Sequence, residues 1–253
     1  MDRFKRVIKH IVPWLLPVFL IIWWYLATVD TTTSSIIPAP GKVWNRAVSM
    51  LKTGQLQQYT AVSTQRALLG LLIGGVIGLV LAIVTGVSKT ADLVLNTSIQ
   101  MLRTVPVLGA ISLMIIWFGI GEEVKIYMVA FGVFFPIYIN TYHGIKNVDK
   151  CLIEMGKVYG LNRFKLFINI ILPSSLSSIL VGLRLSLGTM WLILIAAETI
   201  ATDAGIGYMA MSARELMQMD KVVLCLLIYA LLGKLSDVIA RALEFVLLRW
   251  QRA

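Results

Sequence analysis

Six apolar runs alternate with polar segments along the chain, and this pattern predicts a helical membrane protein. The runs cover residues 11–27, 66–86, 105–120, 125–143, 177–200 and 222–240. A helix rises about 1.5 Å per residue, and about 20 apolar residues cross the hydrocarbon core of a bilayer. Because each run is close to this length, we expect six transmembrane helices in an all-α, polytopic membrane fold.

The polar segments divide the chain into four parts. Residues 1–30 hold a basic N-terminus and the first transmembrane helix, 31–64 an external segment, 65–244 the membrane core, and 245–253 a C-terminal tail. A cleaved signal peptide is the competing interpretation of the first run, but the run is long for one and no A-x-A cleavage site follows. We therefore expect a retained helix. A turn at 38–41 and a weak amphipathic helix at 43–51 are expected in the external segment.

Composition and charge support a membrane protein and set its orientation. Of the 253 residues, 58% are hydrophobic and 14% are charged, with a mean hydropathy of +0.83. Soluble domains carry about 25% charged residues. The net charge of +10 comes from basic residues that punctuate apolar runs, which argues against a nucleic-acid partner. Most of them flank the cytosolic ends when both termini are placed in the cytosol, as the positive-inside rule requires.

Small residues recur at every fourth position in the second run: Gly70, Gly74, Gly78, Ala82 and Gly86. Small residues at this spacing let two helix backbones approach closely in lipid. The stripe predicts tight packing against a neighbouring helix, which the pattern alone does not identify.

The loop at 146–175 has the signals of two short helices at the membrane surface. Gly160 is expected to end the first helix, because glycine accepts the left-handed geometry of a C-cap. Asn162 is expected to cap the second helix and Pro173 to end it. With Glu154 at its head, this ordered and basic loop is predicted to contact a cytosolic partner.

Five positions of this loop resemble the EAA loop of ABC-importer permeases in identity and spacing. They are Glu154, Gly160, Ile170, Leu172 and Pro173. Met155 and Gly156 depart from the pattern, since they replace its two alanines, and Gly156 is expected to loosen the first helix by about 1 kcal/mol.

Three further stretches, 98–126, 182–223 and 229–244, resemble the aliphatic sulfonate permeases of this family, which are grouped with those for taurine and nitrate. The resemblance implies a type I importer permease (MetI-like) fold with a core at 65–244. It also implies a homodimer in membrane lipid, two cytosolic ATPase subunits that bind ATP and magnesium, and an extracytoplasmic solute-binding protein. The loop would then rest in a groove of the ATPase and transmit its closure.

The chain itself is not expected to be an enzyme or to hold a cofactor. It has no Walker-type phosphate loop and no acid, base and nucleophile at motif spacing, so no catalytic residues are assigned. Cys151 and Cys225 are expected to be free thiols, and no metal-type spacing occurs. A secondary transporter or channel is the alternative class, but it would need ion-coupling residues in mid-membrane and often an internal repeat.

Three charges in or beside the runs are candidates for a translocation path: Arg103, Arg184 and Glu198. Arg184 and Glu198 lie roughly 21 Å apart along one helix, so they cannot pair with each other. An isolated charge in lipid is costly, so each is expected at a membrane face, beside a partner on another helix, or in a polar path. Because a sulfonate is a permanent anion, Arg184 or Arg103 could lower the barrier to its passage, and the hypothesis is that Arg184 contributes to the electrostatics of the path. The alternative is that both arginines only hold helix ends at the cytosolic face.

Overall fold

The structure, a computed structural model, describes residues 2–28, 37–200 and 202–251, and the side chains among them from residue 15 to 250. The described residues are helical or irregular. They form two compact units, one of Met1–Gln58 with Met209–Leu227 and one of Tyr59–Tyr208 with Ile228–Ala253. The helices α3 (Gln55–Val87), α11 (Ile206–Glu215) and α12 (Met219–Leu247) pass from one unit into the other.

The first unit contains α1 (Asp2–Ala27) and α2 (Pro40–Lys52). Trp24 at the end of α1 donates a hydrogen bond from its indole nitrogen to the carbonyl oxygen of Pro38, at 3.1 Å. Arg46 on α2 pairs with Asp220 at the start of α12, with 2.6 Å between Nε and Oδ2. The predicted amphipathic helix at 43–51 is confirmed by α2, which buries Val43 and Met50.

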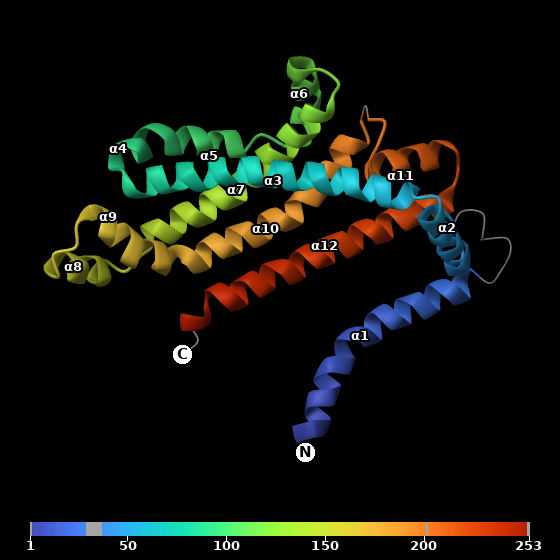
Figure 1. Cartoon of the computed structure of the whole chain (residues 1–253), viewed down its shortest axis with the longest axis horizontal. Coiled ribbons are helices and arrows are strands. Elements are labelled where there is room, and N and C mark those ends of the chain that lie inside the picture. Colours follow the sequence, from blue (N-terminus) through green and yellow to red (C-terminus); the bar gives the residue numbers. More distant parts are fainter. Residues whose placement is uncertain (1, 29–36, 201, 252–253) are drawn as a thin grey trace. The chain divides into compact units, whose positions relative to one another are not determined.

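The second unit is built on three long helices that run side by side (Figure 1): α3, α7 (Glu122–Lys146) and α10 (Leu172–Glu198). α7 occupies the centre, where it packs along α10 and, on another side, against the small-residue stripe of α3. A Cβ added at Gly74 would collide with the backbone carbonyl of Ala130, and one added at Gly70 would lie 2.6 Å from Val129. The stripe therefore packs on α7, as close helix approach requires.

A bent connection joins α3 to α7. It begins with a continuous helical segment made of α4 (Lys89–Ala91), the π-helix η1 (Asp92–Asn96) and α5 (Thr97–Arg103), followed by α6 (Ala110–Phe118). The predicted transmembrane helix at 105–120 is wrong as one continuous element. Pro106 lacks an N–H and disfavours helical geometry at the residue before it, so the chain bends between α5 and α6. The nine residues of α6 extend only about 13.5 Å.

Among the described residues, four helices are long and apolar enough to cross a membrane: Gln55–Val87, Glu122–Lys146, Arg163–Glu198 and Met219–Leu247. They correspond to the second, fourth, fifth and sixth predicted runs. The first run lies in α1, whose apolar part with described side chains is Leu15–Ala27. The count of six uninterrupted spans is thus not reproduced. Every predicted run except the third lies within one helix, apart from the last two residues of the fifth run, which follow the end of α10 at Glu198.

The helix of the fifth run begins earlier than predicted, in the loop itself. α9 (Arg163–Leu166) passes through the π-helix η2 (Phe167–Ile171) directly into α10. Pro173 stands at the first or second position of α10, so the prediction that it ends the helix is wrong. Proline is tolerated where its missing N–H leaves no hydrogen bond unmade, as at the first turn of a helix. The widened turn of η2 directly precedes it.

Candidate functional site

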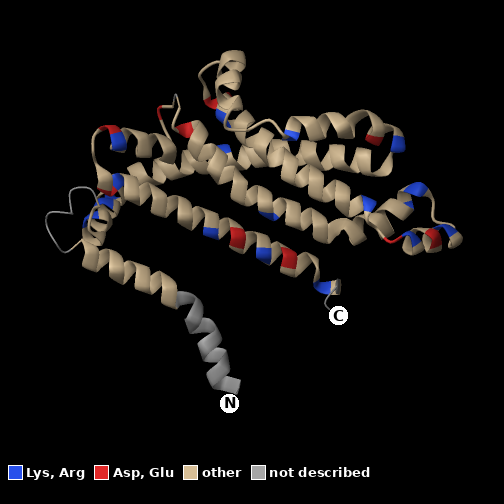
Figure 2. Cartoon of the chain, turned by 180° about the vertical axis from the view of Figure 1, so that it is seen from behind, with Lys and Arg blue, Asp and Glu red and all other residues tan. Residues whose placement is uncertain are grey.

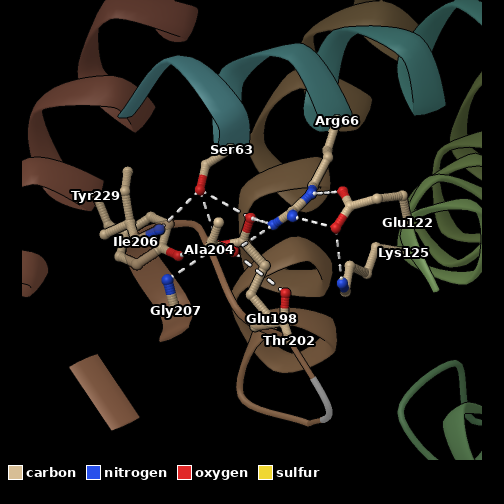
Figure 3. A network of polar contacts seen from close by, with 10 residues as sticks. All are labelled: Ser63, Arg66, Glu122, Lys125, Glu198, Thr202, Ala204, Ile206, Gly207 and Tyr229. Carbon is tan, nitrogen blue, oxygen red and sulfur yellow. Dashed lines mark hydrogen bonds and ion pairs between the residues drawn. The ribbon is translucent and has the colours of Figure 1, made fainter. Parts of the chain in front are cut away.

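A buried network of charges joins the starts of α3 and α7 to the end of α10 (Figure 3). Glu198, in the last turn of α10, is fully buried. Its carboxylate accepts hydrogen bonds from Ser63 Oγ at 2.8 Å, from Arg66 Nη1 at 2.7 Å and from the backbone N–H of Gly207 at 2.9 Å. The hydroxyl of Tyr229 lies 3.3 Å from the same group. These donors compensate the loss of water around a buried carboxylate.

Arg66 extends the network to a second carboxylate. Its Nε and Nη2 donate to the two oxygens of Glu122 at 2.5 and 2.6 Å, the bidentate geometry that favours arginine over lysine. Lys125 approaches the same carboxylate, with 3.1 Å between Nζ and Oε1. The network therefore balances two positive charges with two negative charges. It is buried at Arg66, Lys125 and Glu198 and reaches the surface at Glu122, whose side chain is 61% exposed.

The network also holds the segment that follows α10. Arg66 Nη1 donates to the carbonyl oxygen of Ala204 at 2.7 Å, and the N–H of Ile206 donates to Ser63 Oγ at 2.8 Å. Gly205 has a φ of +115°, and a Cβ there would lie 2.5 Å from Glu198 Oε1. Glycine is therefore required both by the backbone angle and by the space. The arrangement ties this segment to the end of the helix bundle.

The structure separates the three charges that the sequence offered as a path. Glu198 lies in the buried network, and its partner on a neighbouring helix is Arg66. Arg184 pairs with Asp237 of α12, with 2.9 Å between Nη2 and Oδ1. Arg103 is exposed in the last turn of α5, not at the start of a membrane helix, and within the described chain no ion pair or hydrogen bond joins it to the other two. Their place in a translocation path stays a prediction.

Sequence reasoning missed most of the buried network. Ser63 lies in the predicted external segment, Glu122 between two predicted runs, and Arg66 at the first position of a membrane run. The one available signal was the need of Glu198 for a cation, but Arg66 lies 132 residues away in the chain. Nothing in the sequence pattern distinguished Arg66 from the other basic residues that could have paired with Glu198.

At Gly160 and Asn162 the loop at 146–175 has the local geometry that its sequence predicts. α8 (Lys150–Val158) ends at Gly160, where φ is +76°. The N–H of Gly160 bonds to the carbonyl of Lys157 at 2.9 Å and that of Leu161 to the carbonyl of Gly156 at 3.0 Å, a Schellman motif. The Asn162 side chain accepts from the N–H of Lys165 at 2.8 Å and so caps α9.

Two details of the loop differ from expectation. Glu154 is exposed in the middle of α8 rather than at its head, because Asp149 is the N-cap and accepts from the N–H of Cys151 at 2.8 Å. Gly156 is buried, and a Cβ there would lie 2.5 Å from Ile170 Cδ1 and 2.7 Å from Leu166 Cδ1. This glycine therefore lets α8 pack closely on the helix that leads into α10. Of the remaining loop positions, Ile170, Leu172 and Pro173 are half-buried.

The C-terminal end of α7, which leads into this loop, contacts the π-helix η1. Asp92 Oδ2 lies 2.8 Å from Lys146 Nζ, and Asp92 Oδ1 accepts a 2.8 Å hydrogen bond from the hydroxyl of Tyr142. Hydrogen bonds from Lys146 and Tyr142 stabilise the ionised carboxylate and hold the pKa of Asp92 below its ordinary value. Among the described residues, no group of three or more His, Cys, Asp or Glu side chains could hold a metal ion.

Comparison with known proteins supplies the family. Residues 74–247 match the family described as binding-protein-dependent transport system inner membrane component. The chain is 50% identical to the putative aliphatic sulfonates transport permease protein SsuC of Escherichia coli (strain K12), over 98% of this chain and 95% of that protein. It is 33% identical to the taurine transport system permease protein TauC of the same organism, over 93% of this chain and 87% of the relative.

A solved structure supports the fold. The structure of an amino acid ABC transporter with histidines contains a chain that superposes with a TM-score of 0.63 at 18% identity, over 78% of this chain and 96% of that one. This likeness agrees with the predicted all-α fold of importer permeases, and the relatives are transport permeases rather than enzymes. The chain belongs to the family of binding-protein-dependent inner membrane components, as the multi-pass permease subunit of an ABC transporter.

Proposed function

We propose that this permease imports aliphatic sulfonates. The observation that carries the proposal is the 50% identity, over almost the whole chain, to the putative aliphatic sulfonates permease. Taurine is the second candidate substrate, supported by the 33% identity to the taurine permease. Taurine is itself a sulfonate that carries an amino group, so the two candidates differ in whether a positive charge accompanies the anion.

Uptake selectivity tests this proposal. Cells that lack their own sulfonate and taurine permeases receive this chain together with its partner ATPase and solute-binding protein. Import of radiolabelled ethanesulfonate, competed by unlabelled ethanesulfonate more strongly than by taurine, is the expected result. Stronger competition by taurine would favour the second candidate, and the absence of uptake of either compound would refute both.

The loop at 146–175 is proposed to couple the permease to the ATPase, as an EAA loop. The proposal is supported by an exposed surface of apolar and basic side chains. This surface lies on two short helices whose ends are fixed by the turn at Gly160 and the cap at Asn162. Val158, Tyr159 and Phe164 are exposed apolar side chains that stand among the cations Lys157 and Arg163. Exposed apolar side chains rimmed by charge mark a protein contact surface. Glu154 and Gly160 lie on the same scaffold.

Copurification tests this surface. Val158→Asp is expected to abolish recovery of the ATPase subunit with the permease. Val158 is 87% exposed, and its replacement would place a carboxylate in an apolar contact, where burying the charge is costly. Trp44→Asp serves as the control, since Trp44 is an exposed apolar residue of α2, outside the loop. Equal recovery of the ATPase with both variants would exclude the loop as the contact.

In the proposed assembly, two copies of this chain span the membrane with both termini in the cytosol. ATP and magnesium bind to the ATPase subunits, and a solute-binding protein delivers the substrate from outside. The orientation rests on the distribution of basic residues. It places the exposed native Cys151 inside and residue 210 outside. In a chain whose Cys225 is replaced, an impermeant thiol reagent should label Cys151 only from the cytosolic side. In a second variant, which lacks both native cysteines and carries Ala210→Cys, the reagent should label the new cysteine only from outside. The reverse result would invert the topology.

A further inference from the structure

One edge of α12 carries charges at helical spacing. Lys234, Asp237, Arg241 and Glu244 follow one another at intervals of three, four and three residues, which places them on a single edge of a helix. We call them the charged edge. Figure 2 shows blue and red positions alternating along the C-terminal half of α12. The neighbouring exposed face of the same helix is apolar and includes Leu231, Leu235 and Val238.

The charged edge and Arg184 form a cluster in which cations exceed carboxylates. Asp237 pairs with Arg184 at 2.9 Å and with Arg241 at 2.8 Å, and Glu244 lies 3.7 Å from Arg184. Lys234 approaches Asp237 only to 3.8 Å, and 68% of its side chain is exposed. Three cations therefore share two carboxylates. The surplus positive charge is concentrated at Lys234, which has the longest contact to Asp237 and the most exposed side chain.

The position of Lys234 along α12 keeps it within the membrane. α12 has 29 residues, whereas the hydrocarbon core accommodates about 20 helical residues. Any 20 consecutive residues of α12 include Lys234. Charged side chains within membrane helices are rare and face a bundle interior or a water-filled cavity, since facing lipid is costly. The apolar face with Leu235 suits lipid, and the charged edge suits water.

We propose that the charged edge lines the aqueous translocation path and that Lys234 binds the sulfonate group during passage. The inference rests on the proposed function and names a site for its substrate. A lysine ammonium is a compact, hydrated point charge with three rotatable donors, so it attracts an anion without the rigid bidentate grip of arginine. A site on a path must bind weakly enough to release. Arg184, for which the sequence suggested a contribution to the electrostatics of the path, acts as a positioning residue that holds Asp237 and Glu244.

Thiol labelling tests whether the edge faces water. In the assembled transporter with Cys151→Ala and Cys225→Ala, single cysteines are introduced as Lys234→Cys and, as control, Leu235→Cys. The probe is 2-sulfonatoethyl methanethiosulfonate, a charged reagent that itself carries a sulfonate. Because hydrocarbon excludes this charge, Lys234→Cys should react at least about tenfold faster than Leu235→Cys. Excess ethanesulfonate should slow the reaction. Equal rates at the two positions, or a fast rate that ethanesulfonate leaves unchanged, would overturn the inference.

Uptake kinetics test the role of the charge. Removing one positive charge near a bound anion should raise the KM of Lys234→Gln for ethanesulfonate about five- to tenfold. Lys234→Arg should retain most of the affinity, and Arg249→Gln, beyond the end of α12, serves as the control for loss of a charge. If the wild type imports ethanesulfonate and Lys234→Gln has an unchanged KM, this inference fails alone. If the wild type imports none, the proposed function fails.

Discussion

Replacing Arg66 by methionine should destabilise the permease strongly, because it leaves Glu198 buried without its cation. The Arg66 side chain is 3% exposed and Glu198 is fully buried. Methionine fills part of the volume but donates no hydrogen bond. The variant therefore loses the contacts of the guanidinium to Glu198, Glu122 and the carbonyl of Ala204 together. What remains around Glu198 is neutral: the hydroxyls of Ser63 and Tyr229 and one backbone N–H.

The burial of the pair sets the magnitude. Removing one partner of a buried ion pair costs about 3–5 kcal/mol, because the other charge stays desolvated. The matched control is Arg46→Met, since Arg46 pairs with Asp220 at 2.6 Å but has a side chain that is 36% exposed. An exposed pair contributes only about 0–1 kcal/mol. For a chain of this size each kcal/mol corresponds to roughly 2–4 °C in Tm, so Arg66→Met should lower Tm by roughly 6–20 °C.

Thermal unfolding of the purified permease in detergent measures these shifts. The double variant Arg66→Met with Glu198→Gln should recover part of the loss, because the uncompensated charge is gone. This recovery distinguishes stranded charge from simple loss of packing. A Tm of Arg66→Met no lower than that of Arg46→Met would refute the reasoning, as would a double variant less stable than Arg66→Met.

Three further predictions concern packing, the loop and pH. Gly74→Ala should disrupt the contact of α3 with α7 and lower the yield of folded protein, whereas Gly188→Ala, which has no atom within 4 Å of the added Cβ, should leave the yield unchanged by size-exclusion chromatography. Gly160→Ala should cost about 1–2 kcal/mol at its positive φ and reduce ATPase copurification with Tm changing by only a few degrees. Because the folded pKa of Asp92 is lowered from 3.8, its stabilisation is fully present above that value and lost as pH falls through the lower pKa. Asp92→Asn should therefore flatten the loss of Tm in that acidic range, which an unchanged acid profile would contradict.

Local signals in the sequence predicted the loop well. The Schellman turn at Gly160 and the cap at Asn162 depend on residues at most five positions apart, so both could be inferred without knowing the fold. Pro173 was misjudged because proline signals a boundary but does not say which side of it is helical. The π-helix η2, which carries the chain from α9 into α10, has no comparable sequence signal.

Non-local features were accessible only in part. The small-residue stripe showed that α3 packs closely on another helix, but the choice of α7 depends on the arrangement of the bundle. The polar network combines four charges from three helices, and only Glu198 stood out within an apolar run. The prediction of a continuous membrane helix at 105–120 was wrong for a different reason. The hydropathy of this run resembles that of a membrane span, but Pro106 bends the backbone.

In the proposed function, this chain couples ATP hydrolysis on its partner to import of a sulfonate through the loop that carries Glu154. The most direct test of this proposal is the rate of ethanesulfonate import by proteoliposomes that contain the permease, its ATPase and the solute-binding protein, compared between wild type and Glu154→Lys. The control, Glu123→Lys, makes the same charge change at an exposed residue of α7. We expect ATP-dependent import by the wild type and the control, and none by an intact Glu154→Lys complex. Import without ATP, or normal import by Glu154→Lys, would contradict it.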